Sequence, residues 1–226
     1  MNFVKWQLIA VFTLFLMYSY MLLNEKAFWG SYQESRRAQI ASEFLEEGHS
    51  LLIPTLQGSP IITKPSLFYW LQAVCMKFFG QNETGARLPS VFFGIISILA
   101  VYLTGSRWRN KGTAIYSAAV LLSSFFFLSY IRIAELDMGL CSAIIVSSYC
   151  LYRAVFEKKY SHIWGFFFWV GLTIGFFIKG PYAVFPLVAL SICLFIGNSK
   201  RFFKIIINPG IFFYFYLRFL LSLYYE

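Results

Sequence analysis

The sequence has little charge for its length, and acidic residues are especially few. Only 13% of its 226 residues are charged, with ten Asp and Glu against nineteen Lys and Arg. A soluble domain carries about 25% charged residues, so this composition excludes an ordinary water-soluble globular protein. Hydrophobic residues make up 59% of the chain, aromatic residues 21%, and long apolar runs recur throughout. We therefore predict an integral membrane protein.

The sequence also lacks the patterns that bind metals or nucleic acids. Its four cysteines lie in apolar segments without CxxC or Cys/His spacing, which is typical of buried packing residues. His49 and His162 are isolated and offer no metal-ligand spacing. No basic run accompanies a soluble fold, so no nucleic-acid partner is expected. Internal repeats are absent too, which weakens the hypothesis of a transporter built from repeated halves.

Seven apolar segments are each near the ~20 residues that a helix needs to cross a bilayer. The first run has no small-x-small cleavage site, so we predict an uncleaved helix rather than a signal peptide. The expected fold class is an all-α polytopic membrane protein of about seven transmembrane helices, in one domain over residues 1–226. The predicted spans are 4–24, 88–106, 113–131, 138–156, 162–178, 181–197 and 203–223.

The charges between these spans predict their orientation. If the N-terminus is cytoplasmic, the inside loops hold nine basic residues: Arg107, Arg109, Lys111, Arg153, Lys158, Lys159, Lys200, Arg201 and Lys204. The opposite face then holds eight of the ten acids: Glu25, Glu34, Glu43, Glu46, Glu47, Glu83, Glu135 and Asp137. This distribution follows the positive-inside rule and places the long loop 25–87 outside the cytoplasm.

The long loop has predicted structure of its own. Apolar residues at Ala38, Ala41 and Leu45 follow helical spacing, which indicates an amphipathic helix on the membrane surface. Residues 52–65 read as extended chain and turns, with several prolines and a glycine. Residues 65–80 are apolar but too short to be a confident span. We predict a second interfacial or half-buried helix there, with Pro65 at its first position.

On this topology several ionisable residues meet at the outer membrane boundary: Glu34, Lys64, Arg132, Glu135, Asp137 and Lys179. Ionisable groups at membrane level are costly and tend to line cavities or to pair. A carboxylate there can take a proton from an acceptor hydroxyl, while Lys and Arg can hold a phosphate leaving group. A lipid-linked phosphosugar presents its phosphate at this depth.

Each of these residues also has a plainer interpretation. Glu34 alone is more simply a solvated loop acid, or a partner of a neighbouring arginine. Lys64 is an interfacial anchor, Lys179 snorkels from a helix end, and Asp137 is the N-cap of the fourth span. The sequon that begins at Asn82 is short and accidental.

The order of the loop residues indicates a protein family more specifically than their charges do. The motif positions are Glu34, Arg36, Ala38, Gly48, Pro54, Gly58, Pro60, Lys64-Pro65, Leu67, Tyr69-Trp70, Phe79-Gly80 and Arg87-Leu88-Pro89-Ser90, followed by ELDMG around Asp137 and IKGP around Lys179. From about residue 25 to about residue 200, this order resembles the bacterial C-type-fold membrane glycosyltransferases. Those families are the protein O-mannosyltransferase-like proteins and the aminoarabinose transferases that modify lipid A.

The resemblance implies a function. It implies inverting transfer of a sugar from a polyprenyl-phosphate donor to an envelope glycolipid or protein, at the outer face of the bacterial inner membrane. By the same resemblance, Glu34 and Asp137 are the expected catalytic acids, and Lys64, Lys179 and Arg36 the expected donor-phosphate ligands. No metal is required, although Glu34 and Asp137 could share a divalent cation.

The sequence departs from the family pattern in three ways. Gln33 stands where the first acid of an Asp-Glu pair is expected, and a neutral amide cannot act as a base. Thr63 stands where an acid often precedes Lys-Pro. The chain is also short, which suggests an incomplete C-terminal part. The second hypothesis is therefore an inactive relative that only binds the lipid carrier or partner membrane proteins.

Overall fold

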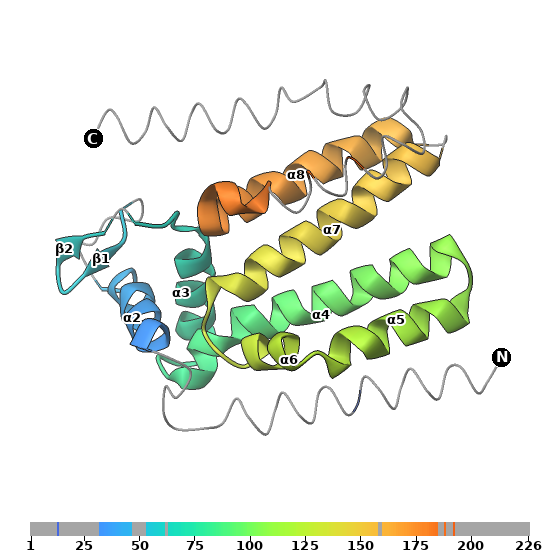
Figure 1. Ribbon diagram of the computed structural model, residues 1–226. Helices are drawn as coiled ribbons and strands as arrows, with labels where there is room; N and C mark the ends of the chain where they lie inside the picture. Colours follow the sequence, from blue (N-terminus) through green and yellow to red (C-terminus); the bar gives the residue numbers. More distant parts are fainter. Residues whose placement is uncertain are drawn as a thin grey trace. The chain divides into compact units, whose positions relative to one another are not determined.

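The computed structural model describes residues 32–46, 53–61, 63–157 and 160–184, together with the single positions 13, 188 and 192. The predicted spans 4–24 and 203–223, and most of 181–197, lie outside the described residues. The described chain is mostly helical, with one small β-hairpin (Figure 1). It divides into two compact units, Met1–Ser142 and Ala143–Glu226, and the boundary falls within helix α7.

The first unit contains α2 (Tyr32–Glu43), α3 (Leu67–Phe79), α4 (Glu83–Trp108), α5 (Lys111–Ser123), α6 (Phe125–Ile131) and the start of α7 (Leu136–Phe156). Between α2 and α3, strands β1 (Thr55–Leu56) and β2 (Ser59–Pro60) pair antiparallel. The second unit contains the rest of α7, α8 (Ser161–Lys179) and the 3-10 helix η1 (Gly180–Ala183).

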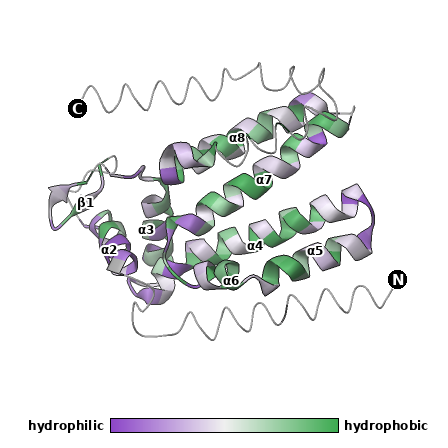
Figure 2. Cartoon of the chain, viewed as in Figure 1, coloured by the Kyte–Doolittle hydropathy of each residue, from purple (hydrophilic) through white to green (hydrophobic). Residues whose placement is uncertain are grey.

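Three described helices are long and apolar enough to cross a membrane: α4, α7 and the run Ser161–Ala183. They confirm the predicted segments 88–106, 138–156 and 162–178 as helices of spanning length. Figure 2 shows hydrophilic residues on α2 and in the loop between α4 and α5. The middles of α4 and α5 carry hydrophobic residues. The orientation predicted from the basic loops stays a prediction.

The predicted span 113–131 is not one straight helix. Helices α5 and α6 meet at Ser124 with a bend of 73°, and only together do they have the length of a span. Ser124 leaves helical geometry at φ −71° and ψ 118°, and the Ser123 hydroxyl donates to the Val120 carbonyl at 2.8 Å. Adjacent serines compete with the backbone for its hydrogen bonds, which is a known cause of helix kinks.

Helix α4 begins at a well-formed cap. The Asn82 side-chain oxygen accepts from the Gly85 backbone N–H at 2.9 Å, and Glu83 places a negative charge in the first turn. Asn82 therefore has a local structural role that accounts for its presence. Helix α3 starts at Leu67 after Ser66, so the prediction that Pro65 occupies the first helical position is wrong by two residues.

Helices α2 and α3 pack together through the apolar stripe that the sequence predicts. Ala38 and Ala41 are buried among residues from α3, the start of α4 and the loop before α7. The apolar face of α2 thus packs within the protein, and its place on the membrane surface stays a prediction. The two helices predicted in the long loop are thus confirmed as α2 and α3. Leu45, which the sequence predicts on the apolar face of the first helix, follows the end of α2. The cluster consists of Ala38, Ile40, Ala41, Phe44, Tyr69, Ala73, Met76, Ala86 and Ala134. This apolar cluster holds α2 against α3 and the start of α4, and thereby positions the polar residues that these helices carry.

Candidate functional site

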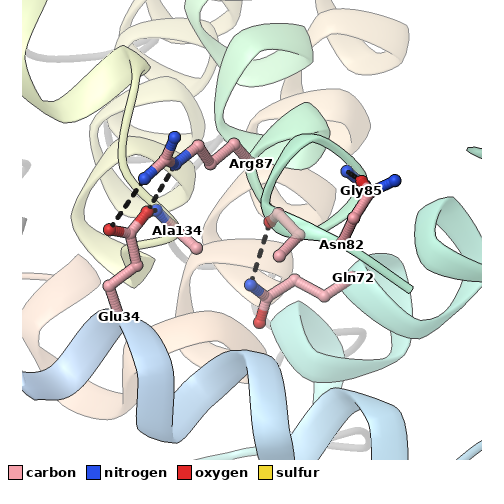
Figure 3. Close-up of polar contacts among 7 residues, drawn as sticks. Glu34, Gln72, Asn82, Gly85, Arg87 and Ala134 are labelled. Atoms are coloured by element: carbon pink, nitrogen blue, oxygen red, sulfur yellow. Dashed lines mark hydrogen bonds and ion pairs between the residues drawn. The ribbon is translucent and has the colours of Figure 1, made fainter. Parts of the chain in front are cut away.

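The Glu34 carboxylate lies at the centre of a buried polar contact in the first unit. It accepts hydrogen bonds from Arg87 Nε at 2.8 Å and from Arg87 Nη2 at 3.3 Å. It also accepts from the Ala134 backbone N–H at 2.9 Å, as Figure 3 shows. The Glu34 side chain is fully buried, and Arg87 is 2% exposed. The interpretation of Glu34 as a solvated loop acid is therefore wrong.

This contact joins three segments that are distant in sequence. Glu34 is on α2, Arg87 is 53 residues later in the first turns of α4, and Ala134 is 100 residues later in the loop between α6 and α7. A buried ion pair is tolerated only when further hydrogen bonds satisfy both charges, and the Ala134 N–H supplies one of them. The pair therefore holds the long loop against two helical segments.

A second ion pair lies one helical turn away on α2. Arg37 pairs with Glu135, which directly follows the Ala134 that Glu34 contacts. The buried phenol of Tyr69 on α3 is hydrogen-bonded to Arg37. Burial raises the pKa of Tyr69, and the positive charges of Arg37 and Arg36 partly offset that rise. At neutral pH Tyr69 is therefore a neutral hydrogen-bonding group.

Four of the five predicted site residues belong to the first unit. Glu34 and Arg36 are on α2, Lys64 lies between β2 and α3, and Asp137 lies in the first turn of α7. Arg36, Lys64 and Asp137 are half-buried. Lys179, also half-buried, is the last residue of α8 in the second unit, so its convergence with the others stays a prediction.

Two details of the predicted site change. Asp137 lies inside α7, which begins at Leu136, so the interpretation of Asp137 as the helix N-cap is wrong. An acid in the first turn is still favoured by the helix dipole. Gln33 precedes Glu34 on α2 but is exposed, so the amide and the buried carboxylate face different surroundings.

Arg87 and Glu43 make buried contacts that no sequence pattern predicts. In the sequence, Arg87 is recognised only as part of the Arg-Leu-Pro-Ser motif. A lone arginine at the start of an apolar helix nevertheless indicates that a partner acid exists. The sequence predicts only that Glu43 is an acid on the outer face. In the structure its buried carboxylate binds the β-hairpin. No local pattern pairs either residue with a partner so far along the chain. The described ranges contain no cluster of three or more His, Cys, Asp or Glu that could hold a metal ion.

Comparison with known proteins identifies the family. The family model described as dolichyl-phosphate-mannose-protein mannosyltransferase matches residues 63–223. The chain therefore belongs to this family, which confirms the resemblance seen in the loop motifs.

Individual relatives agree with the family. The chain is 28% identical over 202 residues to the undecaprenyl phosphate-alpha-4-amino-4-deoxy-L-arabinose arabinosyl transferase of Yersinia enterocolitica, covering 88% of this chain and 36% of the relative. It is 30% identical over 177 residues to an uncharacterized protein of Aquifex aeolicus, covering 76% of this chain and 34% of that protein. The chain thus spans about a third of the length of these curated relatives.

Solved structures share the fold. The crystal structure of ArnT from Cupriavidus metallidurans in the apo state has a TM-score of 0.75 at 17% identity, covering 96% of this chain and 44% of that protein. The same protein bound to undecaprenyl phosphate has a TM-score of 0.73 at 18% identity, covering 89% of this chain and 42% of that protein. At this identity the likeness shows the fold alone, and it covers less than half of that protein.

Proposed function

We propose that this chain takes part in transferring a sugar from a polyprenyl-phosphate donor to an envelope acceptor, which is lipid A, another glycolipid or a protein. The observation that carries the proposal is the match over 88% of the chain to a relative named as an undecaprenyl-phosphate aminoarabinose transferase. The family match over residues 63–223 supports the same reaction class. The reaction would take place at the outer face of the bacterial inner membrane, where the positive-inside rule puts the loop 25–87.

The proposed chemistry is a direct displacement at the anomeric carbon of the donor. The acceptor hydroxyl attacks this carbon, the bond to the phosphate oxygen breaks, and the phosphate leaves with the electron pair. A carboxylate takes the proton from the acceptor hydroxyl. Lys64, Lys179 and Arg36 would bind the donor phosphate and stabilise the charge that develops on it.

Glu34 and Asp137 are the two proposed carboxylates, and their surroundings differ. Three donors already occupy Glu34, so it would have to give up one of them in order to receive a proton from a substrate. Asp137 is half-buried in the first turn of α7, three residues after the Ala134 that Glu34 holds. Glu34 is fully buried whereas Asp137 is half-buried, and this difference in exposure favours Asp137 as the base and Glu34 as the residue that supports its loop.

The first test is binding and transfer by the purified full chain. We expect the wild-type chain to bind undecaprenyl phosphate, and Lys64→Ala to weaken binding by about tenfold, the effect of losing ~1.4 kcal/mol of a charge-assisted contact. Asp137→Asn should leave this binding unchanged but abolish sugar transfer to envelope lipids, measured by mass spectrometry. Unchanged transfer in both Asp137→Asn and Glu34→Gln would exclude the proposed carboxylates.

A second candidate function is binding of the lipid carrier without transfer. It is favoured by Gln33, which is exposed on α2 at the position where the family resemblance implies an acid. Carrier binding without transfer by the wild-type chain, together with gain of transfer in Gln33→Asp, would support this alternative. A strain that lacks the chain and still carries all its envelope sugars would also support this alternative.

A further inference from the structure

The carboxylate of Glu43, at the last residue of α2, binds the β-hairpin. Its Oε2 accepts from the Thr55 hydroxyl at 2.6 Å, and its Oε1 accepts from the Gln57 backbone N–H at 2.6 Å. The Gly58 backbone N–H adds a longer contact to Oε2 at 3.4 Å. Glu43 is 6% exposed, so these bonds form largely away from water. Hydrogen bonds to an ionised carboxylate are about twice as strong as neutral ones.

The turn of the hairpin is shaped for an anion. Gln57 and Gly58 have φ values of +54° and +75°, and positive φ at both central residues is what a type I′ turn requires. Successive backbone N–H groups in such a turn converge into a concavity that favours negative charge. Glu43 supplies that charge, because both turn N–H groups donate to its carboxylate.

The hairpin in turn restrains the segment that carries Lys64. The Ile61 N–H donates to the Pro54 carbonyl at 2.7 Å, which closes the hairpin, and Ile61 packs against the core between α2 and α3. Lys64 is the fourth residue after β2 and the third before α3. At no more than ~3.6 Å per residue, its Cα lies within roughly 14 Å of the end of the hairpin. Lys64 thus lies on a short connection between the hairpin and α3.

We propose that Glu43 is a positioning residue for Lys64: by fixing the β1–β2 hairpin on α2, its carboxylate sets where the Lys64 ammonium meets the donor phosphate. This inference rests on the proposed function, because it takes Lys64 as a phosphate ligand. Glu43 contacts the hairpin, and in this proposal it does not need to contact the donor. Its effect on donor binding therefore passes through Lys64.

The test is a double-mutant cycle on the affinity of the purified full chain for undecaprenyl phosphate. We expect Glu43→Gln to weaken binding by about tenfold, corresponding to ~1.4 kcal/mol of coupling between neighbouring residues. Because Glu43 acts through Lys64, Glu43→Gln should add nothing in a Lys64→Ala background. Glu46→Gln is the matched control: it removes the same charge from an exposed residue three positions later and should bind like the wild type.

A milder variant guards against general misfolding. Thr55→Val removes one donor to Glu43 and keeps the charge and both backbone donors. It should weaken binding less than Glu43→Gln, and again only when Lys64 is present. The inference would be overturned if Glu43→Gln and Thr55→Val both bound with wild-type affinity. It would also be overturned if their losses of affinity multiplied with the loss caused by Lys64→Ala. If Lys64→Ala alone bound normally, the phosphate role of Lys64 would fail, and the inference would fail with it.

Discussion

At the scale of single residues, three charged side chains of α2 connect it to other segments: Glu34, Arg37 and Glu43. Glu34 holds Arg87 and the Ala134 N–H, Arg37 holds Glu135, and Glu43 holds the hairpin. A solvated amphipathic helix would direct its charges to water, where ion pairs contribute little. Glu34 and Glu43 are buried and Arg37 is half-buried, so the loss of a partner leaves a charge that water compensates poorly. Substitutions on this helix therefore test the assembly of the loop as well as chemistry.

The Glu34–Arg87 pair predicts a large loss of stability. Glu34→Gln leaves the Arg87 guanidinium buried without its counter-charge, which typically costs about 3–5 kcal/mol of unfolding free energy. Denaturant unfolding of the purified chain in detergent would measure the loss. Exposed Glu46 is the control, and Glu46→Gln should change stability by no more than about 0.5 kcal/mol. Replacing both partners, as in Glu34→Gln with Arg87→Met, should recover part of the stability. If Glu34→Gln and Glu46→Gln lost equal amounts of stability, that result would contradict the buried pair.

At the scale of elements, close backbone approaches and a bend shape the first unit. A Cβ added at Gly105 of α4 would lie 2.8 Å from the Ala114 Cα of α5, and one added at Gly94 would lie 2.7 Å from Ile131 of α6. Glycine thus lets both partner helices approach α4. The bend at Ser124 separates α5 from α6, after which the chain enters the loop that Glu34 and Arg37 hold.

Gly105 gives the element-scale prediction. Gly105→Ala should reduce stability, even though alanine favours a helix by about 1 kcal/mol over glycine, because the added atom meets backbone that cannot rotate away. Gly105→Leu should cost more, about 1–3 kcal/mol, which is the usual range for overpacking. Thermal unfolding in detergent would rank the variants. Leu103→Ala on the exposed side of α4 is the control and should have little effect; a stabilised Gly105→Ala would show that the helices do not approach so closely.

At the scale of the whole molecule, the orientation in the membrane decides whether the proposed site faces the donor. Three of the described helices are long and apolar enough to cross a membrane, or four if α5 and α6 form one span. The basic residues Arg107, Arg109 and Lys111 lie at the junction of α4 and α5. The hairpin, Lys64 and α3 precede α4, so they lie at its opposite end. The positive-inside rule predicts that they lie on the outer face.

Cysteine labelling would test this orientation. With the native cysteines replaced, Ser59→Cys in the exposed hairpin should react with a membrane-impermeant maleimide in intact spheroplasts. Arg109→Cys, also exposed, should react only after the membrane is opened, because its loop is predicted to be cytoplasmic. Labelling of Arg109→Cys but not of Ser59→Cys in intact cells would invert the topology and rule out an outward-facing site.

The sequence alone determined the elements that depend on local composition. Length and hydropathy located the helices at 88–106, 138–156 and 162–178, and helical spacing located the buried face of α2 at Ala38 and Ala41. Only the tertiary structure decided which charges meet. Glu34 pairs with Arg87, 53 residues away, and Glu43 accepts a hydrogen bond from the turn of the β-hairpin. The predicted span 113–131 bends at Ser124. Hydrophobic period is a property of neighbouring residues, whereas ion pairing depends on how separate helices pack, and no local pattern contains that information.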